Sequence, residues 1–196
     1  MFTGIVTAIG NINKAVPRDG GLRLTIDAGM LDLSDVVVGD SIAVNGICLT
    51  VIAAHGDRFD VDVSQETIDC TAGLDPGNDV NLEKSLRLSD RLGGHLMSGH
   101  VDGVGEVRRF KPAGDSFLLV IRAPHDLAKY IARKGSITVN GVSLTVNRVI
   151  GAEFEINLIP HTIAVTNLKH LQSGSRVNLE VDLIARYIER LQHYGA

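Results

Sequence analysis

The sequence predicts an all-β protein that consists of two similar small antiparallel barrels. The segment Ser41–Val51 recurs 95 positions later as Ser136–Val146 without a gap, so the chain contains a duplicated domain. Short segments of alternating apolar and polar residues follow one another at even spacing, with turn residues between them, which is typical of a small barrel. We therefore expect a first barrel over residues 1–95, a second over 96–182 and a separate C-terminal helix over 183–196.

The composition indicates a well-folded protein that binds neither nucleic acid nor a membrane. Hydrophobic residues make up 44% of the 196 positions, and the 19 Lys and Arg residues are scattered, with a net charge of −4. No basic stripe therefore favours a polyanion. The N-terminus lacks the charged leader and apolar run of a signal peptide, and no apolar run is long enough to span a bilayer. We expect a cytoplasmic protein.

Known cofactor and hydrolase motifs do not occur in the sequence. Cys48 and Cys70 stand in no C-x-x-C arrangement, and in a reducing compartment they would be free thiols, so neither a disulfide nor a zinc site is expected. There is no G-x-G-x-x-G loop, no P-loop and no G-x-S-x-G elbow. These observations argue against a nucleotide-binding protein, a redox-cofactor enzyme and a serine hydrolase.

The strands can be placed in chain order. The first half opens with a predicted strand over Phe2–Ile12, whose glycines permit a bend or a close ligand, and its counterpart is Met97–Val107. Further strands are expected where short alternating segments lie between turns, at Leu22–Asp27, Ser41–Val44, Cys48–Ala53, Phe59–Val63 and Val80–Leu82. The halves join near Gly93-Gly94 without a long linker, so we expect the barrels to lie close together.

Only two segments have a helical pattern. His125–Ala132 follows Pro124 and fits a short helix. Leu183–His193 is stronger, because its apolar residues lie at helical spacing on one face. Nothing in the first half corresponds to this last helix. It either packs on its own barrel or joins copies of the chain.

The repeated Asn-Gly pairs predict tight hairpin turns, because both residue types tolerate a positive φ. Each turn is followed by two polar residues that point to one face of a strand, Cys48 and Thr50 in the first half and Ser143 and Thr145 in the second. With the intervening leucines in the core, these polar pairs would line an opening. A row of hydroxyl groups there suits a neutral ligand that carries hydroxyl groups of its own.

Single polar residues have simpler explanations beside the functional one. His95 and His100 are five positions apart on a predicted strand, with no cysteine or second carboxylate nearby, so we expect an acid, a base or a hydrogen-bond donor rather than a metal site. Asp182 precedes the last helix, where capping alone explains an aspartate. Lys134 could equally be an ordinary surface charge.

Differences between equivalent positions are more informative than any single residue. They occur at Cys48 and Ser143, Ile5 and His100, Phe2 and Met97, and Gly39 and Lys134. Two similar pockets that hold two copies of one molecule in different roles would require such differences. A protein that simply binds the same ligand twice would not.

Several motifs together resemble the riboflavin synthase family: M-F-T-G-I-V at the start, V-N-G-x-[CS]-L-T-V in each half, G-G-H-L-M-S-G-H-V-D-G at the junction and N-L-I-P-H-T later. The resemblance implies two six-stranded antiparallel Greek-key barrels, a C-terminal helix that holds a homotrimer together, and no metal or organic cofactor. It implies a dismutation in which two molecules of 6,7-dimethyl-8-ribityllumazine give riboflavin and 5-amino-6-(D-ribitylamino)uracil, the last step of riboflavin biosynthesis. An association with lumazine synthase, which makes the substrate, is left open.

The resemblance also implies the site residues. The first-half pocket would use Gly4, Ile5, Val6, Cys48, Leu49, Thr50, Asp62, Val63, Ser64, Gln65, Glu66 and Thr67. The second-half pocket would use Gly99, His100, Val101, Lys134, Ser143, Leu144, Thr145, Asn157, Leu158, Ile159, Pro160, His161 and Thr162. In the family, a complete site forms where one barrel meets the other barrel of a neighbouring subunit.

We also expect five side chains near the reacting atoms: Ser41, Cys48, Thr50, His100 and Asp182. The ring of Phe2 is expected to close the pocket. The alternative is a lumazine-binding antenna protein, which resembles the same duplicated barrel but does not turn its ligand over. Both halves here keep the V-N-G-x-[CS]-L-T-V motif, which favours the enzyme. A purely structural barrel protein would leave the paired hydroxyl groups without a use.

Overall fold

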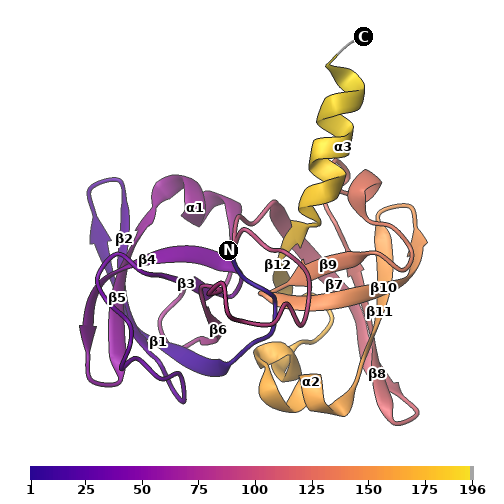
Figure 1. Ribbon diagram of the computed structural model, residues 1–196. Coiled ribbons are helices and arrows are strands. Elements are labelled where there is room, and N and C mark those ends of the chain that lie inside the picture. The colour runs from indigo at the N-terminus through magenta and orange to yellow at the C-terminus, as the bar shows by residue number, and fades with distance from the viewer. Residues whose placement is uncertain (195–196) are drawn as a thin grey trace.

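The protein consists of two closed six-stranded antiparallel barrels that lie side by side, followed by one projecting helix (Figure 1). The computed structural model describes residues 1–194. The last two residues of the helix range predicted as 183–196 therefore lie outside the described residues. The all-β prediction and the duplication are confirmed.

The first barrel has the strand order β1-β2-β5-β4-β3-β6. Its elements are β1 (Ala8–Arg18), β2 (Gly21–Asp27), β3 (Ser41–Val44), β4 (Ile47–His55), β5 (Arg58–Ser64), α1 (Gln65–Cys70) and β6 (Asp79–Lys84). The second barrel closes in the order β10-β11-β8-β7-β12-β9. Its elements are β7 (Gly103–Ala113), β8 (Ser116–Arg122), η1 (Ala128–Tyr130), β9 (Ser136–Val139), β10 (Val142–Ile150), β11 (Glu153–Leu158), α2 (Pro160–Val165), η2 (Asn167–His170) and β12 (Arg176–Val181).

Strand alternation separates the core of each barrel from its outer face. On β4, Ile47, Leu49 and Val51 are buried in the first core, whereas Cys48 and Thr50 between them face outward. The Asn-Gly turns have the predicted geometry, with φ of 49° at Asn45 and 81° at Gly46, and near-identical values in the second copy. The repeated motif is therefore a β-hairpin in both barrels.

The N-terminal segment does not form the predicted strand from Phe2. Strand β1 begins only at Ala8, and the counterpart strand β7 begins at Gly103 rather than at Met97. Gly4 and Gly99 have φ of 76° and 78°, a left-handed conformation that interrupts an extended strand. We call residues 2–6 and 97–101 the crossing segments, because each leaves its own barrel to contact the other.

The short helices were only partly predicted. The range His125–Ala132 contains just one 3-10 turn, η1, and α1 and α2 were not expected. Their signals are local: the Ser64 hydroxyl caps α1 by accepting from the Thr67 N–H at 3.2 Å, and Pro160 stands in the first turn of α2. A helix of six residues is too short to show a periodic pattern.

The C-terminal helix α3 (Leu183–His193) agrees with the predicted range and projects away from the second barrel (Figure 1). Asp182 caps it, accepting from the Ile184 N–H at 3.0 Å. Its base is tied down by an ion pair between Arg186 and Asp102. Among residues 1–194, no helix is both long and apolar enough to cross a bilayer.

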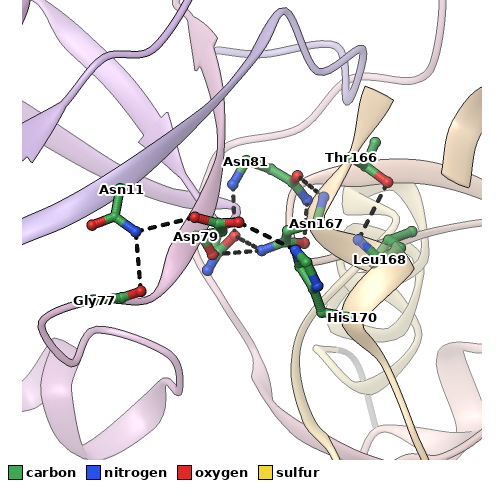
Figure 2. Close-up of polar contacts among 9 residues, drawn as sticks. Asn11, Gly77, Asp79, Asn81, Thr166, Asn167, Leu168 and His170 are labelled. Carbon is green, nitrogen blue, oxygen red and sulfur yellow. Dashed lines mark hydrogen bonds and ion pairs between the residues drawn. The ribbon is translucent and has the colours of Figure 1, made fainter. Parts of the chain in front are cut away.

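A cluster of buried asparagines joins the two barrels. The Asn81 side chain donates to the Asn140 carbonyl at 2.8 Å and to Asn167 Oδ1 at 2.9 Å, and it accepts from the Asn167 N–H at 2.7 Å. Asn167 also donates to Asn45 Oδ1 in the turn between β3 and β4, and to the Asp79 carbonyl on β6. Figure 2 shows Asn167 beside Asp79 and Asn81 of the first barrel. Because these amides bond to groups of the opposite barrel, they fix how the barrels are docked.

We predict that Asn81→Ala lowers the free energy of unfolding by at least ~2 kcal/mol. The change leaves buried donors and acceptors of both barrels without hydrogen-bond partners. Urea denaturation followed by circular dichroism measures the change. Asn78→Ala is the matched control, since Asn78 lies three residues away with an exposed side chain. Equal midpoints for the two variants would contradict the role given to Asn81.

Candidate functional site

The crossing segments exchange partners between the barrels. The Cys48 N–H donates to the Gly99 carbonyl at 2.7 Å, and the Ser143 N–H donates to the Gly4 carbonyl at 2.9 Å. Each outward-facing strand end is thus bordered by a segment from the other half. The expected grouping, with Gly4 beside Cys48 and Gly99 beside Ser143, needs correction. The repeat aligns equivalent residues but does not say which barrel a segment lies against.

The apolar residues of the crossing segments show the same exchange. Val6 packs against the core of the second barrel, and Val101 packs against the core of the first. The neighbouring residues, Ile5 and His100, are exposed. The first pocket therefore combines β4 and β5 with residues 99–101, and the second combines β10 and β11 with residues 4–6.

The first pocket presents a polar outer face. Cys48 is half-buried and a free thiol, and Thr50 is exposed beside it. On β5, Asp62 is held by two hydrogen bonds from Arg23, at 2.7 and 2.8 Å, and these bonds lower the pKa of the Asp62 carboxyl. Ser64 follows on the same face and shares a 3.0 Å hydroxyl contact with Thr67. These groups can hydrogen-bond a ligand that carries hydroxyl groups.

The second pocket repeats this arrangement with other side chains. Ser143 is half-buried, and Thr145 is exposed. Asn157 stands in place of Asp62, so this position has a neutral amide where the first pocket has a carboxylate. The Asn157 side chain accepts from the Ser116 hydroxyl at 2.8 Å. Ile159 stands where Ser64 stands in the first half, which makes this end of the pocket more apolar.

Some predicted ligand-binding residues point away from both pockets. Leu49, Val63 and Leu158 are buried in the barrel cores with at most 4% exposure, and Leu144 packs against the second core. Only their backbones border the outer face. The remaining predicted residues of the two helix-bearing loops have accessible side chains: Gln65, Glu66, Pro160, His161 and Thr162.

A buried glutamate fixes each crossing segment. Glu83 on β6 accepts from the Thr3 N–H and hydroxyl, both at 2.6 Å, and from the Gly4 N–H at 2.9 Å. Glu180 on β12 accepts the equivalent three bonds from Ser98 and Gly99 at 2.7 to 3.0 Å. Sequence reasoning missed both glutamates, although they stand at equivalent places in the repeat.

Burial raises the pKa of both the Glu83 and Glu180 carboxyls, and the hydrogen bonds from the crossing segments hold that rise back. The side chains are costly to bury, and each is matched to three donors. Their placement links a strand of one barrel to the pocket of the other: Glu83 holds Gly4, and Gly4 in turn holds Ser143.

Phe2 lies inside the molecule. Its ring is fully buried between the barrels with Ala43 and Met97, and Cys48 packs against this cluster. Phe2 and Met97 are joined by an antiparallel β-bridge between the two crossing segments. The ring therefore supports the back of the first pocket, because the crossing segment carries it inward.

Ser41 lies at the edge of a large cleft. It pairs with Thr50 across β3 and β4, and it lines a cleft of about 870 Å³ beside the first barrel. Ile5 of the second pocket lines the same cleft. In the second barrel the equivalent side carries α3, whose Glu189 bonds to Lys129 and Tyr130.

Lys134 has an unusual backbone. Its φ is 67°, where the equivalent Gly39 has 100°, and a left-handed lysine is less favourable than a glycine. Its side chain is exposed and donates to Asn147 at 3.3 Å, at the end of the polar face of β10. A lysine in this unfavourable backbone conformation is a candidate for a functional role of its charge.

His100 and His95 belong to different pockets. His100 is exposed on the crossing segment beside Cys48, so it joins the first pocket rather than the second. His95, which the expected site did not include, lies 2.7 Å from the Ser143 hydroxyl in the second pocket. Among residues 1–194, no group of three or more His, Cys, Asp and Glu side chains is placed to hold a metal ion.

Comparisons with known proteins agree with this geometry. The model of the lumazine binding domain matches the chain twice, over residues 3–85 and 98–182. Riboflavin synthase of Photobacterium phosphoreum is 46% identical over 193 residues, covering 97% of this chain and 88% of that protein. The chain belongs to the riboflavin synthase family. Riboflavin synthase of Brucella abortus is 41% identical over 201 residues and covers 99% of both chains.

Solved structures of related proteins show the same fold. LumP complexed with riboflavin superimposes with a TM-score of 0.84 at 34% identity, covering 92% of this chain and 99% of that chain. LumP complexed with 6,7-dimethyl-8-(1'-D-ribityl) lumazine gives a TM-score of 0.83 at 33% identity and the same coverage. Full-length relatives of 41–46% identity that are riboflavin synthases make this chain an enzyme of that family.

We predict that Glu83→Gln and Glu180→Gln act on opposite pockets. An amide nitrogen cannot accept the Gly4 or Gly99 N–H, so each variant should lower stability by about 1–3 kcal/mol and release one crossing segment. Amide chemical shifts in NMR spectra measure the local effect. Glu83→Gln should move the Ser143 amide more than that of Cys48, and Glu180→Gln should do the reverse. Equal shifts in both variants would show that the glutamates do not act through the crossing segments.

Proposed function

We propose that this enzyme catalyses the dismutation of two molecules of 6,7-dimethyl-8-ribityllumazine to riboflavin and 5-amino-6-(D-ribitylamino)uracil. One observation carries the proposal: each chain has two similar polar pockets whose bordering side chains differ. Cys48 and His100 border the first, whereas Ser143 and His95 border the second. A reaction between two identical molecules needs one pocket for the donor of four carbons and another for the acceptor.

The chemistry makes modest demands on the protein. The methyl group on C7 of the lumazine is acidic because its anion delocalises into the ring, so a weak base can start the reaction. Holding two rings face to face removes much of the entropic barrier, about 7–11 kcal/mol in intramolecular models. Positioning by the hydroxyl groups, with Ser41, Cys48, Thr50, His100 and Asp182 near the reacting atoms, would then supply most of the catalysis.

The complete site is proposed to form between subunits of a homotrimer, where the first barrel of one chain faces the second barrel of its neighbour. Support comes from α3, which exposes an apolar face in the single chain. The exposed fractions of Ile184, Tyr187, Ile188 and Leu191 lie between 51 and 74%. Such a face is stabilised when it packs against other copies. We place this enzyme in the cytoplasm, with lumazine synthase as a candidate partner.

A second candidate is a binding protein that holds lumazine without converting it. This candidate is considered because LumP, on which the chain superimposes, has been solved with bound riboflavin and with bound lumazine. Both pockets have polar residues, which favours the enzyme. A protein that holds a single chromophore needs only one polar pocket.

Purified protein incubated with dimethylribityllumazine should form one riboflavin for every two lumazine molecules consumed. Chromatography with absorbance detection follows both compounds. Tight binding of lumazine without loss of the compound would reject the dismutation and support the binding protein. A heat-denatured sample controls for the uncatalysed reaction.

Deleting residues 183–196 should lower the oligomeric state and abolish turnover, because the site between subunits can no longer assemble. Lumazine binding to single pockets should persist. Sedimentation velocity measures the oligomeric state, and fluorescence titration measures binding. A truncated protein that remains trimeric would show that α3 does not hold the subunits together.

A further inference from the structure

The two pockets differ most at the back of the repeated hairpin. In the second barrel Thr138 pairs with Ser143 across β9 and β10, and in the first barrel Ala43 pairs with Cys48 at the equivalent place. His95 lies in the segment that joins the two halves, next to the Gly93-Gly94 pair. Thr138, Ser143 and His95 therefore form a polar group in the second half. The first half has Ala43 and Cys48 in place of Thr138 and Ser143.

The surroundings of Cys48 and Ser143 differ accordingly. Behind Cys48 the space is filled by the apolar cluster of Phe2, Ala43 and Met97. Behind Ser143 lies the half-buried imidazole of His95, with Nδ1 2.7 Å from Ser143 Oγ and Nε2 3.4 Å from Thr138 Oγ1. Three polar groups thus form a line that ends at the second pocket.

The buried hydroxyl of Thr138 determines which atom donates in each of these hydrogen bonds. Its side chain is 1% exposed, and among residues 1–194 its hydroxyl has one hydrogen-bond partner, His95 Nε2. A buried hydroxyl without an acceptor is destabilising, so Thr138 donates to Nε2. The proton of the neutral imidazole is then on Nδ1, which donates to Ser143 Oγ.

The imidazole must be neutral for this arrangement. Burial lowers the pKa of His95, and the Asp182 carboxylate opposes that shift more weakly. Asp182 does not replace Thr138 as the partner of Nε2, because its carboxylate caps α3. The line is therefore not a Ser-His-Asp triad, in which the imidazole would accept the serine proton.

The position of His95 is fixed by its backbone. Its N–H donates to the Thr3 carbonyl at 3.1 Å. Gly94 passes so close to Ser143 that an added Cβ would lie 2.9 Å from Ser143 Oγ and 2.0 Å from the Thr3 carbonyl oxygen. Only glycine fits there, and it brings the imidazole against the hydroxyl.

We propose that Thr138, His95 and Ser143 form a relay that fixes the Ser143 hydroxyl as a hydrogen-bond donor to the ring of the ligand in the second pocket. Because Ser143 Oγ accepts a hydrogen bond from Nδ1–H, the serine O–H group is directed to the ligand. Hydrogen bonds in a chain polarise one another, so this donor is stronger than an isolated serine. Thr138 and His95 are positioning residues, and Ser143 makes the contact.

This inference rests on the proposed dismutation and assigns the two lumazine molecules to their pockets. Loss of a C7 methyl proton breaks a C–H bond, leaves the electron pair on the ligand as a delocalised anion and passes the proton to water. A fixed donor stabilises the charge that this anion places on ring oxygen or nitrogen. The second pocket therefore holds the lumazine that is deprotonated, and the first pocket, with its apolar support for Cys48, holds the other.

Deuterium exchange tests the relay without requiring riboflavin formation. The full-length protein is incubated with dimethylribityllumazine in D2O, and loss of the C7 methyl signal in proton NMR gives the exchange rate. Wild-type protein should accelerate exchange over the free compound. His95→Ala and Ser143→Ala should lower the accelerated rate by about tenfold or more, as expected when a hydrogen bond to a charged group is lost. Thr138→Val should have a smaller effect in the same direction.

Two further variants separate positioning from folding. His95→Asn keeps a donor near the place of Nδ1 and should retain most of the exchange rate. If the role of His95 were purely structural, Asn would not be expected to preserve the rate better than Ala. His125→Ala is the matched control, because His125 is exposed outside both pockets. If His95→Ala fails to fold, the contrast between Asn and Gln at position 95 carries the test, since Gln places its amide near the position of Nε2.

Two results would overturn the relay. One is exchange at the wild-type rate in the folded variants at positions 95 and 143. The other is wild-type protein that binds lumazine and does not accelerate exchange. Failure of the dismutation is a separate result, seen as accelerated exchange without riboflavin.

Discussion

The three hydrogen bonds that each buried glutamate accepts hold the two halves in their working arrangement. Glu83 and Glu180 sit on the last strands of the barrels, where they fix Thr3–Gly4 and Ser98–Gly99. Those segments then bond to the opposite barrel, through Gly4 to Ser143 and through Gly99 to Cys48. Each pocket consequently depends on both barrels, and a barrel by itself lacks one border of its pocket.

Duplication followed by a few replacements explains how one fold provides two different pockets. The hairpin, its Asn-Gly turn and the buried glutamate are the same in both halves, because they maintain the barrel and the crossing. The replacements lie behind the hairpin, where a buried aromatic ring supports Cys48 and an imidazole supports Ser143. Similar shape with different polarity is what the proposed reaction between two identical molecules needs.

The buried asparagines show how a turn residue gains a second use. Asn45 and Asn140 occupy left-handed turn positions, and their side chains also accept from the N–H groups of Asn81 and Asn178. The asparagines thus connect each hairpin to the last strand of its barrel, while Asn167 joins one barrel to the other (Figure 2). An Asn-Gly motif read only as a turn misses this contribution.

The sequence by itself determined the duplication, the barrels, the hairpins, the range of α3 and the residue types around the pockets, because these depend on repeat spacing and local alternation. Only the tertiary structure decided which barrel each crossing segment lies against, that Phe2 is buried, and that His95 meets Ser143. Those outcomes depend on hydrogen bonds between residues tens of positions apart, such as Ser143 to Gly4. A periodic pattern carries no information about such pairs, so only the folded chain could bring them together.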